Sequence, residues 1–86
     1  MWISIWKFSL PVADSFDLSM PEGSTVLSIQ VQIGSPVLWA LCDPARPNHA
    51  RHFRTYGTGH QISSDPGCYV GTYQLGPFVG HVFEVT

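Results

Sequence analysis

Hydrophobic and polar residues alternate with a period of two along much of the chain, and this pattern predicts β-strands rather than helices. In the first segment, one face carries four large apolar side chains, those of Trp2, Trp6, Phe8 and Leu10. From Phe16 to Met20, apolar residues alternate with Asp17 and Ser19. Both segments are typical of strands with one buried face.

The clearest alternation runs from Thr25 to Ile33, where the odd positions carry Leu27, Ile29, Val31 and Ile33. Gly34 and Ser35 follow as a two-residue connection, and glycine in its first position favours a type II′ hairpin turn. The next segment, 37–42, is apolar on both faces. It is therefore predicted to lie at the centre of a sheet or to be buried at an interface.

The second half of the chain predicts three more strands, at residues 51–56, 68–74 and 78–85. Two prolines at 44 and 47 mark a loop before them, and Gly76 and Pro77 connect the last two. No window has the apolar spacing of an amphipathic helix. Seven short strands favour an all-β fold, a small antiparallel sandwich or a partly open barrel, formed as a single domain over residues 1–86.

The composition narrows the class of protein. Charged residues make up 12% of the 86 residues, about half of the roughly 25% usual for soluble domains, while the apolar share is ordinary. This excludes a disordered chain and a coiled coil. No apolar run approaches the roughly 18 residues of a membrane-spanning helix, so no membrane association is expected. The net charge of −2 provides no overall attraction to nucleic acid.

The N-terminal residues and the cysteines predict the compartment. Lys7 interrupts the first apolar run, so the start of the chain lacks the pattern of a secretory signal. The chain has two cysteines, Cys42 and Cys68, whereas a secreted domain of this size usually carries more. We expect a cytoplasmic protein with both thiols reduced, and a single Cys42–Cys68 disulfide is the alternative.

The main candidate for function is a basic segment that contains three of the four Lys and Arg residues, Arg46, Arg51 and Arg54. Strand alternation places His52, Arg54 and Tyr56 on one face and Arg51, Phe53 and Thr55 on the other. The predicted ligand-binding residues are Arg51, His52, Arg54, Tyr56, Thr58 and His60.

Each residue type in this segment has a chemical reason to bind an anion. The arginines would hold phosphate, Tyr56 would stack on a base, and Thr58 and His60 would donate or accept hydrogen bonds. The backbone N–H groups of Gly57, Thr58 and Gly59 could form an anion-binding nest. The alternatives are a solvated strand edge with charges that prevent pairing, and a protein-binding edge.

Metal binding and catalysis have weaker signals. His49 and His52 are three residues apart, but a zinc site needs three or four ligands at defined spacing, so no metal site is predicted. The chain has no Gly-x-Ser-x-Gly nucleophile motif and no adjacent carboxylate pair. A pairing of Cys42 with His52, His60 or His81 stays open. We expect a protein that is not an enzyme and needs no cofactor.

Large apolar residues exceed what one small core would need, because Trp2, Trp6, Phe8 and Trp39 add to the two-sided 37–42 segment. This favours a homo-oligomer in which the second apolar face is covered by another copy. Low surface charge favours the same outcome. The alternative is a single core filled with large side chains.

Several short motifs together resemble a family of small proteins found in bacteriophages and prophages. They are MPEG (20–23), LSIQVQ (27–32), LWAL (38–41) with DP (43–44), RxFR (51–54) leading into GTGH (57–60), GT (71–72) and HVFE (81–84). The resemblance covers nearly the whole chain. The family has no characterised function, so it supplies no catalytic residues. It implies a phage accessory protein that acts in the host bacterial cytoplasm.

Together these features predict an anti-defence binding protein that sequesters an anionic small molecule, such as a cyclic signalling nucleotide. The alternative is a protein–protein inhibitor or adaptor that acts on a host enzyme or defence complex through an edge strand or apolar face. A minor structural or assembly protein of the virion is a third hypothesis. Three arginines and a negative net charge argue against a general nucleic-acid binder.

Overall fold

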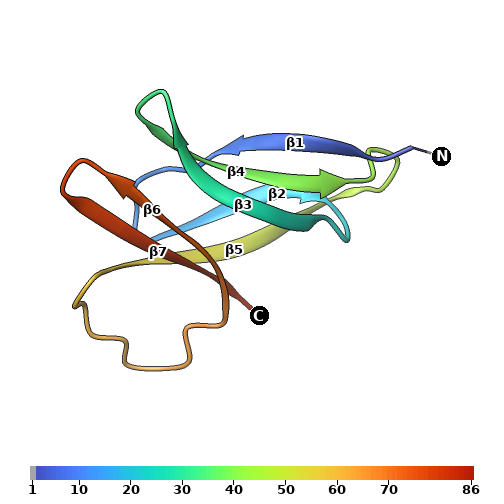
Figure 1. The fold of residues 1–86 in the computed structure, drawn as a ribbon. Helices are drawn as coiled ribbons and strands as arrows, with labels where there is room; N and C mark the ends of the chain where they lie inside the picture. The colour runs from blue at the N-terminus through green and yellow to red at the C-terminus, as the bar shows by residue number, and fades with distance from the viewer. Residues whose placement is uncertain (1) are drawn as a thin grey trace.

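The structure, a computed structural model, describes residues 2–86 and contains seven strands in two antiparallel sheets (Figure 1). The strands are β1 (Ser4–Ser9), β2 (Ser15–Pro21), β3 (Thr25–Gln32), β4 (Ser35–Cys42), β5 (Asn48–Gly57), β6 (Cys68–Leu75) and β7 (Phe78–Val85). Sheet A has the order β1-β4-β3, and sheet B has the order β2-β5-β7-β6. All seven predicted strands are therefore present.

The hydrophobic core lies between the two sheets. It consists of inward-facing side chains from both sheets and from the β1–β2 connection, namely Leu10, Met20, Ile29, Leu38, Ala40, Cys42, Phe53, Tyr73 and Val82. The sheets approach each other most closely where β3 lies along β6. They do not close into a barrel, so the prediction of a sandwich or partly open barrel is confirmed.

Strand β4 occupies the centre of sheet A, as its two apolar faces predict. Leu38, Ala40 and Cys42 point inward and are completely buried. Trp39 and Leu41 lie on the outer face of sheet A and are half-buried. This outer face therefore keeps apolar side chains that the core does not use.

Strand β3 follows the alternation only in part. Of its odd-numbered apolar residues, Ile29 is buried, whereas Leu27 is 50% exposed. The cause is an irregularity in the β3–β4 register between Val26 and Ser28, typical of a β-bulge, which leaves Leu27 without a partner on β4. The prediction of a single apolar face from Thr25 to Ile33 is therefore wrong.

The β3–β4 turn also differs from the prediction. Gln32 pairs with Ser35, so the two-residue loop is Ile33-Gly34 rather than Gly34-Ser35. Both loop residues have positive φ, 50° for Ile33 and 74° for Gly34. This is the signature of a type I′ turn, whose twist matches that of the paired strands. The type II′ prediction was wrong because it placed glycine first in the loop, whereas the pairing of Gln32 with Ser35 makes Ile33 the first loop residue.

The remaining features of the fold agree with the sequence. Gly76, with a φ of 58°, and Pro77 form the β6–β7 connection. Cys42 is buried and Cys68 is exposed, and no disulfide joins the two. Among residues 2–86 no helix is long and apolar enough to cross a membrane.

Candidate functional site

Strand β5 divides the predicted ligand residues between the two faces of sheet B. Arg51 shares the inner face with Phe53, which is completely buried against the core. His52, Arg54 and Tyr56 lie on the outer face, as the alternation predicts. The β5–β6 connection, which projects from the sandwich in Figure 1, carries the remaining two predicted residues.

The outer face of sheet B is lined by aromatic rings from three strands. In the register of the sheet, Phe83 on β7 lies between Arg54 on β5 and Tyr69 on β6. The ring centroid of Phe83 is 5.8 Å from that of Tyr56 and 5.5 Å from that of Tyr69, with both pairs in an edge-to-face arrangement. Tyr69 is 61% exposed, so part of this aromatic surface faces solvent.

A pocket of about 310 Å³ opens beside these rings. Three of the six predicted ligand residues line it, namely Arg54, Tyr56 and His60, together with Asp14, Ser15, Thr55 and Gln61. Among residues 2–86, no carboxylate lies within ion-pair distance of Arg54. An exposed guanidinium next to a phenol ring is suited to bind a ligand that has both an anionic group and a flat ring.

The glycine turn beside the pocket is closed by its own hydrogen bonds. The His60 N–H donates to the Gly57 carbonyl at 3.1 Å, and the Gly57 N–H donates to Nδ1 of His60 at 3.2 Å. Gly59, at φ 85°, occupies the position of a type II turn that requires positive φ. Of the three N–H groups of the expected anion-binding nest, that of Gly57 is therefore already engaged within the turn.

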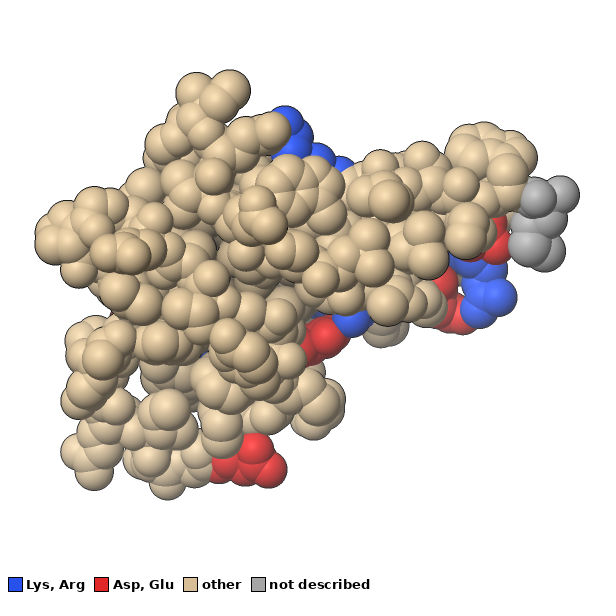
Figure 2. All heavy atoms as spheres, viewed as in Figure 1, with Lys and Arg blue, Asp and Glu red and all other residues tan. Residues whose placement is uncertain are grey.

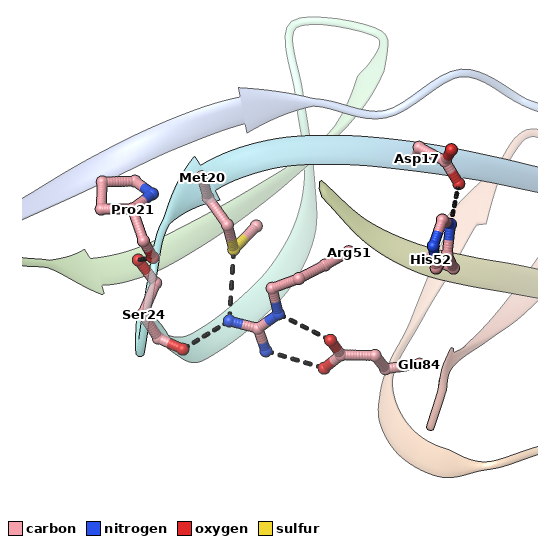
Figure 3. Close-up of polar contacts among 7 residues, drawn as sticks. All are labelled: Asp17, Met20, Pro21, Ser24, Arg51, His52 and Glu84. Atoms are coloured by element: carbon pink, nitrogen blue, oxygen red, sulfur yellow. Dashed lines mark hydrogen bonds and ion pairs between the residues drawn. The ribbon is translucent and has the colours of Figure 1, made fainter. Parts of the chain in front are cut away.

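Arg51 has a structural environment instead of a ligand-facing one (Figure 3). Its guanidinium forms two hydrogen bonds with the Glu84 carboxylate, at 2.6 and 2.7 Å, and a third with the Ser24 carbonyl at 2.5 Å. It also contacts the Met20 sulfur at 3.3 Å. The hydrogen bonds that Arg51 donates to Glu84 raise the pKa of Arg51 above its ordinary value. Arg51 thereby joins β5 and β7 to the turn between β2 and β3.

His52 is also separated from the pocket. It lies opposite Asp17 on β2, and the Nδ1 and carboxylate oxygen are 2.5 Å apart. Together with His49, Arg51 and Glu84 it borders a second, open groove of about 650 Å³. In this groove the positive charge of Arg51 is already balanced by Glu84. The groove is therefore less suited to bind an anion than the pocket at Arg54.

Residues 1–86 match the family model of a domain of unknown function, DUF7352. The chain belongs to this family. The search of curated proteins and the search of solved structures gave no match to the chain.

In this DUF7352 domain, sequence reasoning missed the contribution of β6 and β7 to the outer face of sheet B. His81 lies opposite Tyr56 on one side and opposite Thr72 on the other. Thr58, a predicted ligand residue, is within 2.8 Å of Nε2 of His81. The alternation of β7 does place His81 and Phe83 on one face. It does not reveal that β7 pairs with β5 and β6. For this reason the sequence could not place His81 next to Tyr56, Thr58 and Thr72.

The described residues offer few groups for metal or thiol chemistry. Among residues 2–86, no three His, Cys, Asp or Glu side chains come together to hold a metal ion. Cys42 is 1% exposed and hydrogen-bonded to Ser24 and to the Ala40 carbonyl. Its sulfur therefore lies in the core and is inaccessible as a nucleophile.

Proposed function

We propose that this protein is a non-enzymatic binding module that takes an anionic small molecule, of the nucleotide class, on the outer face of sheet B. The single observation that carries the proposal is the position of Arg54. It lines a pocket with Tyr56 and His60 and has no carboxylate partner among residues 2–86. By contrast, Arg46 pairs with Glu22 and Arg51 pairs with Glu84.

The neighbouring rings support a ligand with a flat aromatic part. Bases stack on exposed aromatic side chains with a gain of about 1–3 kcal/mol each. Next to Arg54, the exposed ring of Tyr69 lies together with the half-buried rings of Tyr56 and Phe83. A phosphate bound by Arg54 would leave the attached base within reach of these rings. The resemblance to phage proteins is consistent with sequestration of a signalling nucleotide, as an accessory protein that opposes host defence.

The test is a thermal-shift screen of the purified protein against cyclic dinucleotides, cyclic trinucleotides and ADP-ribose derivatives. A ligand present at 100 times its Kd adds about 2.7 kcal/mol of stability, which corresponds to a Tm increase of several degrees for a domain of this size. We expect Arg54→Ala to abolish the shift. Arg46→Ala is the matched control, since Arg46 is exposed and lies outside the pocket. Equal shifts for the wild type and Arg54→Ala would exclude this site.

The outer face of sheet A supports a second candidate function, protein docking. Ile3 and Ile5 on this side are 55% and 59% exposed, beside the half-buried Trp39. Lys7 hydrogen-bonds Gln32 on β3 at 2.9 Å, so its aliphatic stem crosses β4. In the view of the molecule in Figure 2, which includes strands of both sheets, charged residues occupy only a small part of the surface. Strand β1 is also an unpaired edge of its sheet.

For this second function, the occupant that we propose is another copy of the chain, with two β1 edges or two outer faces in contact. A host enzyme or defence complex is the alternative occupant. The two are separated by measuring the mass of the pure protein in solution. A dimer or larger assembly supports self-association. A monomer, followed by specific capture of one bacterial protein that depends on Ile5, would support the inhibitor or adaptor function.

A further inference from the structure

Four side chains form a continuous row of hydrogen bonds across the outer face of sheet B. Thr58 Oγ1 lies 2.8 Å from Nε2 of His81, and Nδ1 of His81 lies 3.0 Å from Thr72 Oγ1. Thr72 Oγ1 in turn lies 2.6 Å from the Tyr69 hydroxyl. The row begins in the β5–β6 connection, crosses β7 and ends on β6. All four groups lie at positions that are exposed or half-buried.

The number of protons in this row limits what its two ends can do. With neutral His81, the three hydroxyls and one imidazole N–H supply four protons for three hydrogen bonds. One proton is left, and it belongs to the hydroxyl at one end, or to Thr72 where Thr72 accepts from both of its neighbours. The other end then presents only lone pairs. A neutral row therefore donates a hydrogen bond to a ligand either from Thr58 or from Tyr69, but not from both.

Protonation of His81 changes this balance. Both ring nitrogens then donate, one to Thr58 and the other to Thr72. The Thr58 proton becomes free to point away from the ring, and the Thr72 proton can pass its bond on to Tyr69. Both end hydroxyls become donors, and the row gains a positive charge. This state favours an anion at either end, whereas the neutral state favours it at one end only.

Groups that could bind an anion lie on the strand next to His81 and in the turn that contains Thr58. On β5, Tyr56 lies opposite His81, and Arg54 extends from the same face two residues earlier. His60 lies in the same turn as Thr58. From β6, the titratable group facing His81 is Tyr69, through Thr72. Asp14 lines the pocket at Arg54, which Tyr56 separates from the row, and no described carboxylate forms an ion pair with His81.

From this arrangement we propose that Thr58, His81, Thr72 and Tyr69 belong to the anion site, and that the anion binds together with one proton taken up by His81. The ligand class is an anion whose charge is fixed near neutral pH, such as a phosphodiester, since such a ligand does not bring its own proton. This inference rests on the proposed function. It adds three residues to the site, His81, Thr72 and Tyr69, and it predicts that the affinity for the anion falls as pH rises.

The experiment is an NMR titration of the histidine ring protons and nitrogens from about pH 5 to about pH 8, with and without sulfate. Sulfate is the probe because it stays a dianion throughout this range. His81→Gln assigns the His81 signals, and His49, outside the Arg54 pocket, is the internal control. We expect sulfate to move the His81 midpoint to higher pH and to leave His49 unchanged. The Kd for sulfate should rise by up to about tenfold per pH unit above that midpoint.

Two variants make the outcome decisive. Thr58→Val removes the end hydroxyl and should reduce the sulfate effect on His81, whereas Thr25→Val removes an exposed hydroxyl from sheet A and should not. If sulfate perturbs the Arg54 side-chain signals and leaves the His81 midpoint unchanged, the proton-linked site is wrong while the proposed function stands. If sulfate perturbs neither residue, both proposals fail. If Arg54→Ala keeps the full His81 response, the row binds anions independently of the proposed pocket.

Discussion

Arg51 and Arg54 lie three positions apart on β5 and extend from opposite faces of sheet B. Arg51 is held between the sheets by the Glu84 carboxylate and the Ser24 carbonyl. Arg54 faces a pocket on the outer side. Two residues that form one basic segment in the sequence thus have separate tasks. Substitution of Arg51 should change stability, and substitution of Arg54 should change binding.

The first prediction concerns the Arg51–Glu84 pair. Both side chains are only 20% exposed, so Arg51→Met leaves a largely buried carboxylate without its partner. Breaking a fully buried pair costs about 3–5 kcal/mol, and for this partly buried pair we expect a loss of about 2–3 kcal/mol. Urea denaturation of the two proteins measures the difference.

The control is Arg46→Met, since the Arg46–Glu22 pair is more than half exposed on both sides. Exposed ion pairs contribute about 0–1 kcal/mol, so this variant should unfold close to the wild type. A loss of less than about 1 kcal/mol for Arg51→Met would contradict the clamp role. Both variants should keep the ligand-induced thermal shift, because neither residue lines the pocket at Arg54.

The sequence predicted the strands and the faces of β5 because both follow from local alternation. The order of strands depends on pairing between distant segments, which no local pattern specifies. The grouping of Tyr56 with His81 and of Arg54 with Phe83 depends on that pairing, and so half of the outer face was missed. The bulge at Leu27 and the positive φ of Ile33 were not predicted from the sequence, for a different reason. Each is a local exception imposed by the fit of β3 to its partner strand.

The second prediction concerns Tyr73, whose hydroxyl is buried without a hydrogen-bond partner among residues 2–86. Burial raises the pKa of Tyr73 above its ordinary value. The unfolded chain therefore loses this proton first as pH rises, so the stability of the fold decreases from about pH 10 upward and is unaffected below it. Tyr73→Phe removes this alkaline loss.

Tyr73→Phe should also be neutral or stabilising by up to about 1 kcal/mol near neutral pH, because an unsatisfied buried hydroxyl is costly. Thermal unfolding between about pH 7 and about pH 11 tests both points. Tyr69→Phe is the control, since Tyr69 is exposed and its hydroxyl is hydrogen-bonded to Thr72. An equal alkaline loss in the wild type and Tyr73→Phe would show that another group is responsible.

The third prediction concerns the outer face of sheet A. If a second copy covers it, Ile5→Lys places two charges in that interface and should convert the protein to a monomer. Ile5 is 59% exposed, so the stability of the isolated chain should change by no more than about 0.5 kcal/mol. Light scattering after size exclusion measures the mass. Val12→Lys is the control, because Val12 is 56% exposed but lies in the β1–β2 connection. A wild type that stays monomeric at high concentration would rule out the second copy.

The fourth prediction concerns Ile33, which has a φ of 50° and is 98% exposed at the tip of the β3–β4 hairpin. A β-branched residue in this conformation costs about 1–2 kcal/mol, and no packing at the tip compensates for it. Asparagine followed by glycine is the preferred type I′ pair, so Ile33→Asn should raise stability by about 1 kcal/mol and Tm by about 4–8 °C.

The control is Gly34→Ala at the neighbouring position, where φ is 74°. This variant should lower stability, since alanine is strained in that conformation. If Ile33→Asn raises stability but weakens capture of a partner protein, the strained apolar tip is part of a contact surface. If it lowers stability, the turn is not the type I′ turn described above.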